Sequence, residues 1–428
     1  MIWLLLSIIL LIVLIFFRVN ILITAPIVSI FLCLVSGLDV VDTMATGFMP
    51  AFATFAENNF LIFASSGIFA KVMQDTGMAA AIAKGISNKL GPNFAVFCVF
   101  AVSAILTYGG VSLFVVVFVV YPVALQLFKE ANITRSLIPG AIAAGAFTFA
   151  AFCFPGSPQA GPIIATQYLG TDLMVMPILG IVCGLFMIVV DVFYFNWVLG
   201  RTRKAGRGFE TDAEIEKEIQ RVENLTLPNV WLSILPIIVV VVTVNFIKLP
   251  VYYCMALGVV VALVFGWKNI PDILDTLNTG VESAVFALVN TCAANGFGGV
   301  AQATQGFADL VEVLTTTSFL PPLLSVGIAT TLIAGACGSG TGGLGIAVST
   351  LGPIYIDMGV DPGLIHRMAC VSCCGLDSLP HNGAVVTLLK YTGISHADGY
   401  IHIGVTTVIV PLLTLVLMFI LGSVGLTF

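Results

Sequence analysis

Charged residues are scarce in this sequence. Asp, Glu, Lys and Arg make up 9% of the 428 residues, whereas soluble proteins contain about a quarter. With 59% hydrophobic residues and a mean hydropathy of +1.11, the chain lacks the polar surface of a soluble domain. We therefore expect an all-α polytopic membrane protein. Since one span takes about 20 apolar residues, there is room for about ten to fourteen spans.

Motifs that would indicate an enzyme or a nucleic-acid-binding protein are also missing. The ten cysteines all fall in apolar runs without CxxC or Cys/His spacing, so we interpret them as small hydrophobes and expect no metal site. The chain contains no nucleophile elbow and no phosphate loop, and we expect neither a cofactor nor enzymatic activity. The net charge of −6 comes without a basic stripe, which argues against nucleic acid as a partner.

The few basic residues predict how the chain crosses the membrane. Their densest group, "RTRKAGR" from Arg201 to Arg207, opens the longest polar stretch, which ends near Pro228. If this group lies in the cytoplasm, both termini lie outside and five crossings precede Arg201. We predict a cytoplasmic linker over residues 201–228, with a short surface helix in "TDAEIEKEIQRVE". The first twenty residues lack a basic start and a cleavage site, which is typical of a retained span rather than a signal peptide.

An internal repeat divides the chain into two halves. Residues 39–47 read "DVVDTMATG" and residues 272–280 read "DILDTLNTG", with five identical positions at an offset of 233. Each half then continues with a long apolar span, a long uncharged stretch and a Pro-interrupted span. If each half makes five crossings, an odd number, the two repeats (residues 1–200 and 229–428) are inverted in the membrane. Inverted repeats with broken helices are typical of secondary transporters.

Two uncharged stretches are far longer than one span. Residues 90–128 and 313–356 contain no Asp, Glu, Lys or Arg, and they are interrupted by "TYGGVS" and "GACGSGTGG". Two full crossings and one re-entrant helical hairpin both return the chain to its starting side, so charge cannot separate them. Gly and hydroxyl residues at the turn favour hairpins, because a loop outside the membrane usually carries charge. Two such tips, entering from opposite sides, would meet near the centre.

Broken helices create sites for anions. A helix N-terminus carries about half a positive charge, Gly lets a ligand approach the backbone, and Ser or Thr adds a donor, which together suit a carboxylate. Close helix packing by small residues is the alternative interpretation. The candidate substrate-binding residues at the two tips and the two broken spans are Gly109, Gly110, Ser112, Ser157, Gln159, Gly338, Ser339, Gly340, Thr341, Ser378, His381 and Asn382.

Few ionisable groups are predicted to lie deep in the membrane. Glu57 falls within an early span, and Asp377 and His381 flank Pro380 in "GLDSLPHNG". A charge at this depth is costly and usually faces a pathway, so these three residues are the candidates for proton coupling. The alternatives are that Glu57 lies near the outer interface and that Asp377 only holds the broken helix together. Asp191 lies six residues before Trp197, and we expect it at the interface.

Other ionisable residues are expected at span ends. We interpret His366, His396 and His402 as interfacial. Arg367 has two interpretations, as an aid to anion entry or as an interfacial anchor. All four tryptophans lie near predicted span ends, which is typical of an aromatic belt.

Several stretches strongly resemble the gluconate permease family of the ion transporter superfamily. They are "GGVSLFVVVFVVYPVAL", "RSLIPGAIAAGAFTFAAFCFPGSPQ", "GSGTGGLGIA" and "GLDSLPHNGAVVTLL". The resemblance implies proton-coupled uptake of a small sugar- or hydroxy-acid anion, such as gluconate or 3-hydroxybutyrate, by a bacterial inner-membrane permease. The superfamily implies a fixed scaffold and a mobile transport region that moves like an elevator, often in a homodimer. Sodium-coupled relatives commonly have Ser-Asn-Thr at their tips; this chain has "YGGVS" and "GSGTGG", which favours protons.

Other functions fit parts of the pattern. A sodium-coupled carboxylate transporter would bind its ion through backbone carbonyls at the tips. The large membrane subunit of a binding-protein-dependent transporter has a similar length and hairpin plan, but would require two protein partners. A passive anion channel explains the titratable groups beside the broken helices poorly. Proton symport accounts for the repeat, the breaks and the Asp/His pair together.

Overall fold

The structure, a computed structural model, describes residues 2–17, 19–111, 113–223, 227–316, 320–380 and 382–426. These ranges contain helices, turns and loops without any β-strand, which confirms the prediction of an all-α protein. The main helices of the first half are α1 (Ile2–Phe16), α2 (Ile21–Ser36), α3 (Val40–Thr43), α4 (Met49–Asp75), α5 (Met78–Leu90), α6 (Ala95–Tyr108), α7 (Leu113–Glu130), α8 (Leu137–Ala143), α9 (Ala160–Leu169) and α10 (Pro177–Lys204). Two π-helical segments, η1 (Met44–Phe48) and η3 (Ala144–Cys153), continue α3 and α8.

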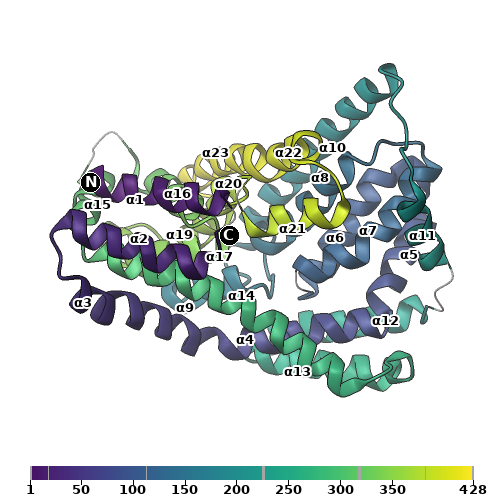
Figure 1. Cartoon of the computed structure of the whole chain (residues 1–428), viewed down its shortest axis with the longest axis horizontal. Coiled ribbons are helices and arrows are strands. Elements are labelled where there is room, and N and C mark those ends of the chain that lie inside the picture. The colour runs from purple at the N-terminus through teal and green to yellow at the C-terminus, as the bar shows by residue number, and fades with distance from the viewer. Residues whose placement is uncertain are drawn as a thin grey trace.

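The polar linker contains the short helix that the sequence predicts, α11 (Ala213–Glu223). Ile215 and Ile219 on one face of α11 are buried, while its other face is polar. Lys129 at the end of α7 places its Nζ 2.7 Å from Glu216 Oε2, and the hydrogen bonds from Lys129 lower the pKa of the Glu216 carboxyl. The linker helix therefore packs along α7 (Figure 1).

The second half continues from the linker with a similar series of helices. They are α12 (Val230–Val242), α13 (Val251–Gly266), α14 (Ile273–Gln302), α15 (Gln305–Thr316), α16 (Pro322–Cys337), α17 (Gly340–Thr350), α18 (Gly352–Asp357), α19 (Pro362–Ser372), α20 (Cys374–Asp377), α21 (Gly383–Thr392), α22 (His396–Gly404) and α23 (Val410–Ser423). The π-helical segments η4 (Thr243–Ile247) and η6 (Val405–Ile409) extend α12 and α22.

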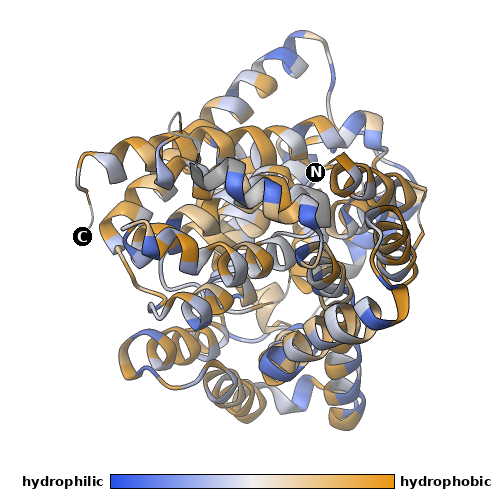
Figure 2. Cartoon of the chain, turned by 90° about the vertical axis from the view of Figure 1, so that its left-hand side faces the viewer, coloured by the Kyte–Doolittle hydropathy of each residue, from blue (hydrophilic) through white to orange (hydrophobic). Residues whose placement is uncertain are grey.

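The outer surface has the apolar character of a membrane protein. Within the described residues, five continuous helical stretches are long and apolar enough to cross a membrane: Pro177–Lys204, Val230–Ile247, Val251–Asn269, Ile273–Gln302 and His396–Ser423. Large hydrophobic side chains such as Phe193, Trp231 and Phe246 are exposed, and Figure 2 shows hydrophobic residues over most helices. Such helices need lipid around them. The nine cysteines with described side chains are free and buried, which confirms their interpretation as small hydrophobes.

Two long helices, α4 and α14, cross at the centre of one side of the molecule (Figure 1). They run antiparallel, because Gly47 just before α4 lies against Gly299 while Gly67 lies against Gly280. A Cβ atom at Gly67 would lie 2.4 Å from the carbonyl oxygen of Gly280. Glycine at this position therefore allows the two backbones to touch.

The two copies of the repeated segment begin with the same kind of helix cap. Asp39 caps α3, accepting from the amide of Asp42, and Asp272 caps α14, accepting from the amides of Leu274 and Asp275. The last residue of each copy, Gly47 or Gly280, then contacts the long helix that the other copy begins. This reciprocal packing supports the prediction of two inverted repeats, which remains a prediction for the chain as a whole.

Both long uncharged stretches contain a pair of helices with a break at the predicted point. In the first, α6 ends at Tyr108 and α7 begins at Leu113; in the second, α16 ends at Cys337 and α17 begins at Gly340. The arms of each pair pack against each other. With 14 and 16 residues, α6 and α16 extend about 21 and 24 Å, less than a hydrocarbon core of about 30 Å. These lengths favour the prediction of re-entrant hairpins.

Candidate functional site

The second broken span supplies the most polar part of the interior. Helix α20 ends at Asp377, and α21 begins at Gly383 after a turn that contains Pro380. Asn382 caps α21, because its Oδ1 accepts hydrogen bonds from the amides of Ala384 (2.7 Å) and Val385 (3.1 Å). Asp377 and Asn382 are both buried. His381, a predicted site residue, lies outside the described residues.

The second hairpin tip is a tight turn between two helices. Gly338 has a φ of 57°, the left-handed conformation that ends α16 and that glycine adopts readily. Ser339 then caps α17, its Oγ accepting from the amide of Gly342 at 3.2 Å. Thr341 lies in the first turn of α17 and is half-buried. The tip thus presents the N-terminus of an 11-residue helix, as the sequence predicts.

The broken span holds this tip directly. Asn382 Nδ2 donates to the carbonyl oxygen of Gly338 and to that of Asp377, both at 2.9 Å. A Cβ atom at Gly340 would lie 2.6 Å from Asp377 Oδ2, so the carboxyl group lies against the first residue of α17. Ser378 Oγ donates to Asp377 Oδ1 at 2.8 Å. The protein's own carboxyl group therefore lies where the dipole of α17 favours a negative charge.

The first half repeats part of this arrangement without the acid. Gln159 Nε2 donates to the carbonyl oxygens of Thr107 (2.6 Å) and Val111 (3.3 Å) at the first tip. In both halves a side-chain amide of the broken span thus binds backbone carbonyls of its own hairpin. Ser157 is fully buried, and its Oγ donates to the carbonyl oxygen of Ala150 at 2.6 Å. Ser112, another predicted residue, lies outside the described part of the chain.

The glycines of the first tip pack against other helices. A Cβ at Gly109 would lie 2.6 Å from Ile237 of α12, and one at Gly110 would lie 2.5 Å from Met255 of α13. These contacts agree with the alternative interpretation, close packing by small residues.

Phe152 connects the first broken span to the second hairpin. A Cβ at Gly161, in the first turn of α9, would lie 2.2 Å from Phe152 Cε1, and one at Gly340 would lie 3.2 Å from its Cζ. Helices α9 and α17 also pack against each other. Residues from both halves therefore meet at the second tip, where Asp377, Ser378 and Asn382 lie. This cluster is the candidate substrate site.

Glu57 has a different environment from Asp377. Its side chain is exposed on α4, and no hydrogen bond or ion pair joins it to either tip within the described residues. Phe55, two residues earlier, would contact a Cβ at Gly345 of α17 at 3.6 Å. Glu57 therefore lies on a helix that passes the second hairpin, with its own side chain turned outward.

His366 and Arg367, which the sequence analysis places at the interface, lie inside the protein and not on its surface. Both side chains are buried, with exposed fractions of 0% and 1%. Arg367 donates from Nε to the carbonyl oxygen of Val175 and from Nη2 to that of Leu173, both at 2.7 Å. Leu173 also accepts from the amide of Gly156, so Arg367 holds the segment that supports the first broken span. Arg367 is thus an internal clamp and not an exposed anchor, and its role in anion entry stays a prediction.

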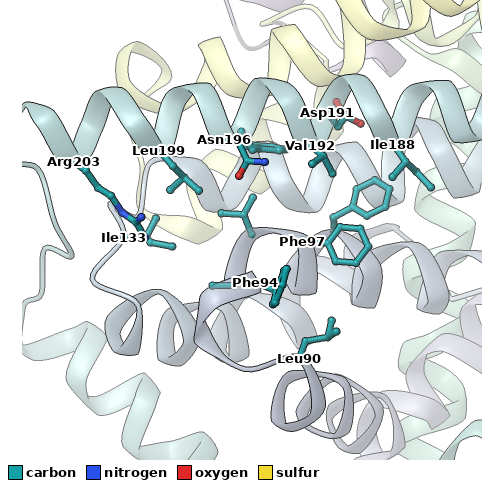
Figure 3. Close-up of a pocket in the computed structure, with 14 residues that line it drawn as sticks. Leu90, Phe94, Phe97, Ile133, Ile188, Asp191, Val192, Asn196, Leu199 and Arg203 are labelled. Atoms are coloured by element: carbon teal, nitrogen blue, oxygen red, sulfur yellow. The ribbon is translucent and has the colours of Figure 1, made fainter.

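Asp191 and His402 are also expected at the interface, and both lie inside the protein and not on its surface. They are 2% and 8% exposed. Asp191 lies in the wall of a pocket of about 410 Å³ between α10 and the α5–α6 region, with Asn196 and Arg203 further along α10 (Figure 3). None of the predicted site residues lines this pocket. The short spacing between Asp191 and Trp197 concealed the burial, because Trp197 itself is exposed.

We expect Asn382→Ala to damage the candidate site more than a substitution that only removes a helix cap. Asn229 provides the matched control, since it caps α12 in the same way, with Oδ1 accepting from the Trp231 amide at 2.8 Å. Each substitution removes a cap worth about 0.5–2 kcal/mol of unfolding free energy. Asn382→Ala also frees the tip at Gly338, so only this variant should lose transport. Thermal unfolding in detergent and uptake into liposomes measure the two effects, and equal uptake by both variants would contradict the role of Asn382.

The broken spans, the helical tips and the apolar exterior together define a class of protein. In a bilayer, irregular backbone inside the protein is tolerated where it lines a cavity or pathway, as in secondary transporters. The chain is a multi-pass membrane transporter. Comparison with known proteins makes the class more specific. The model of the GntP family permeases matches residues 1–253, and that of the Na⁺/H⁺ antiporter family matches residues 165–426.

The chain belongs to the GntP permease family, and its second half shares the Na⁺/H⁺ antiporter family pattern. It is 32% identical to the uncharacterized transporter YxjC of Bacillus subtilis, over 91% of this chain and 92% of that protein. The resemblance found in the sequence is thus confirmed.

Two solved structures share the fold at low sequence identity. The YdaH transporter of Alcanivorax borkumensis, which has an unusual topology, matches with a TM-score of 0.60 and 15% identity over 91% of this chain and 90% of that chain. MtrF of Neisseria gonorrhoeae, from a class of antimetabolite efflux pumps, matches with a TM-score of 0.54 and 12% identity over 90% and 84%. At these identities the likeness concerns the fold alone.

Proposed function

We propose that this transporter imports a small organic anion, a sugar acid or hydroxy acid such as gluconate or 3-hydroxybutyrate, by proton symport. One observation carries the proposal: the buried carboxyl group of Asp377 lies against Gly340 at the N-terminus of α17. A helix N-terminus with a serine cap also suits the carboxylate of a substrate. The substrate and Asp377 therefore compete for one site, and the competition couples transport to protons.

The coupling follows from charge. An ionised Asp377 occupies the positive end of α17 and repels a second carboxylate. When Asp377 takes up a proton, its charge is lost and the helix end becomes free for the substrate anion. The anion and the proton then travel together. Ser378, Asn382 and the hydroxyl groups of Ser339 and Thr341 supply the remaining polar contacts. Glu57 and His381 are the other proton-coupling candidates from the sequence.

The proposed arrangement in the membrane follows the sequence. Both termini lie outside the cytoplasmic membrane of a bacterium, the linker at residues 201–228 lies in the cytoplasm, and the two repeats are inverted. The hairpins and broken spans form a transport region that moves against a scaffold as an elevator, in a homodimer. The antiparallel crossing of α4 and α14 supports the scaffold part of this proposal.

Transport by the purified protein in liposomes tests the proposal. We expect an imposed pH gradient, acidic outside, to drive concentrative uptake of labelled gluconate or 3-hydroxybutyrate without any partner protein. Concentrative uptake driven by a sodium gradient alone would contradict proton coupling. It would indicate instead that sodium binds to backbone sites at the hairpin tips. The match to the Na⁺/H⁺ antiporter family is the reason for including the sodium-gradient experiment. Absence of uptake under either gradient would contradict both the substrate assignment and autonomous transport.

A further inference from the structure

Asp191 is a buried acid that the proposed mechanism does not use. Its side chain on α10 is 2% exposed, and neither carboxylate oxygen has a hydrogen-bond partner within the described residues. Figure 3 shows the carboxyl group on the opposite side of α10 from Leu90 and Phe94, so it faces the interior of the protein. A carboxyl group at this depth without a partner is costly. A ligand that neutralises its charge would account for the burial of this carboxyl group.

Helix α23 and segment η3, which pack against α10, bring no charge to Asp191. They contain no Asp, Glu, Lys, Arg, His or Tyr; the Cys153 thiol is their titratable group. Along α10, the nearest charged side chains are Arg201 and Arg203, and ten residues of helix separate Asp191 from Arg201 by about 15 Å. The smallest ligand that can neutralise Asp191 in this apolar setting is a proton.

A hydrogen-bonded pair lies beside Asp191. Tyr194 follows three residues later and thus projects from the same face of α10. Its hydroxyl lies 2.8 Å from Nδ1 of His402, which is buried on α22. Both groups can accept and donate protons. The pair connects the surroundings of Asp191 to α22.

Helix α22 also contacts the candidate substrate site. Tyr400 donates from its hydroxyl to the carbonyl oxygen of Ser378 at 3.3 Å, beside Asp377. His396, at the exposed start of the helix, places Nε2 3.3 Å from the carbonyl oxygen of Pro380. Helix α22 therefore lies between the surroundings of two buried acids, with His402 turned toward α10 and Tyr400 toward the second broken span. Asp398, its other charged residue, is exposed and paired with Ser395.

We propose that Asp191 is a second proton-binding site, which exchanges its proton through Tyr194 and His402 and acts in series with Asp377. The proton binds one carboxylate oxygen and leaves from the same oxygen, so no other bond changes. The inference rests on proton-coupled transport for its role, while proton binding at Asp191 stands independently of any substrate.

Infrared titration of the purified protein tests proton binding without a substrate. We expect wild-type protein to show a protonated-carboxyl band that disappears as the pH rises and that is missing from Asp191→Asn. The control is Asp212→Asn, at the exposed cap of α11, where asparagine can also accept from the Ile215 amide. This control should leave the buried-carboxyl bands unchanged. Identical titrating bands in wild type and Asp191→Asn would overturn the inference, whatever the substrate is.

Transport assays test the role in coupling. With gluconate and 3-hydroxybutyrate as probes, Asp191→Asn should slow pH-gradient-driven uptake by about tenfold or more, while exchange at equal pH on both sides stays near the wild-type rate. Tyr194→Phe should keep the Asp191 band and slow the same uptake. Proton-driven uptake at the wild-type rate in both variants would overturn the coupling role. If wild type itself shows no such uptake, the proposed function fails and the infrared result alone decides proton binding.

Discussion

The Asp377→Asn variant is expected to bind and exchange an organic anion but not to accumulate it. In the wild type, the Asp377 carboxyl group lies against Gly340, at the helix end proposed for the substrate. The substrate carboxylate gains this position only when Asp377 is protonated. A gradient of about two pH units can drive a one-proton symporter to about 100-fold accumulation. The variant, which has no proton to carry at this position, should stop at about equal concentrations inside and outside.

The same competition predicts a pH dependence of binding. Above the titration range of Asp377, each decrease of one pH unit raises the protonated fraction about tenfold, and the affinity for gluconate should rise by the same factor. At lower pH the affinity should become constant, because the carboxyl group is already neutral. In Asp377→Asn the affinity should not depend on Asp377 titration at all. Calorimetry or quenching of intrinsic fluorescence across pH measures both curves.

Asp361→Asn is the matched control for Asp377→Asn. Asp361 caps α19, with Oδ1 accepting from the Gly363 amide at 2.7 Å, and asparagine caps helices equally well. This variant removes a carboxylate on the helix that precedes the broken span but leaves the proposed site intact. It should accumulate the anion like the wild type. Proton-driven accumulation by Asp377→Asn at the wild-type level would contradict the competition.

Much of this site could be predicted from the sequence because local chemistry determines it. Glycine and serine at "GACGSGTGG" end one helix and cap the next, and both effects act within a few residues. The Pro380 break and the capping by Asn382 are equally local. The sequence repeat aligns Gly47 with Gly280. It does not show that Gly47 contacts the second half of the chain and that Gly280 contacts the first half.

The remaining features depend on contacts between distant parts of the chain. Arg367 is hydrogen-bonded to carbonyl groups 192 and 194 residues away, and Tyr194 meets His402 across 208 residues. A sequence without its fold shows only that these ionisable residues lie near polar or aromatic neighbours, which is also the pattern of an interface. Burial of Asp191 was missed for the same reason: six residues of helix extend about 9 Å, enough to connect an interior to an exposed Trp197.

Gly67→Ala is expected to force the central helix crossing apart. The new Cβ would lie 2.4 Å from the carbonyl oxygen of Gly280 and 2.5 Å from Cβ of Ala284, and backbone atoms cannot move aside locally. Overpacking of this kind costs about 1–3 kcal/mol, more than the gain of up to about 1 kcal/mol in helix propensity. Thermal unfolding in detergent should show a clear loss of stability, and transport should fall with the folded fraction.

A glycine-to-alanine substitution away from the crossing separates the effect of the steric clash from the effect of helix propensity. Gly200 lies inside α10 with nothing within 4 Å of an added Cβ, so Gly200→Ala gains the propensity without a clash and should stabilise the protein. Gly280→Ala should behave like Gly67→Ala, since its Cβ would lie 2.9 Å from Cα of Ile68 and 3.0 Å from the Gly67 carbonyl oxygen. An inverted repeat requires this reciprocity, because each half then places a glycine against the long helix of the other. Stability of Gly67→Ala equal to that of Gly200→Ala would show that the helices can separate without cost, and would remove the physical basis for a rigid scaffold at this crossing.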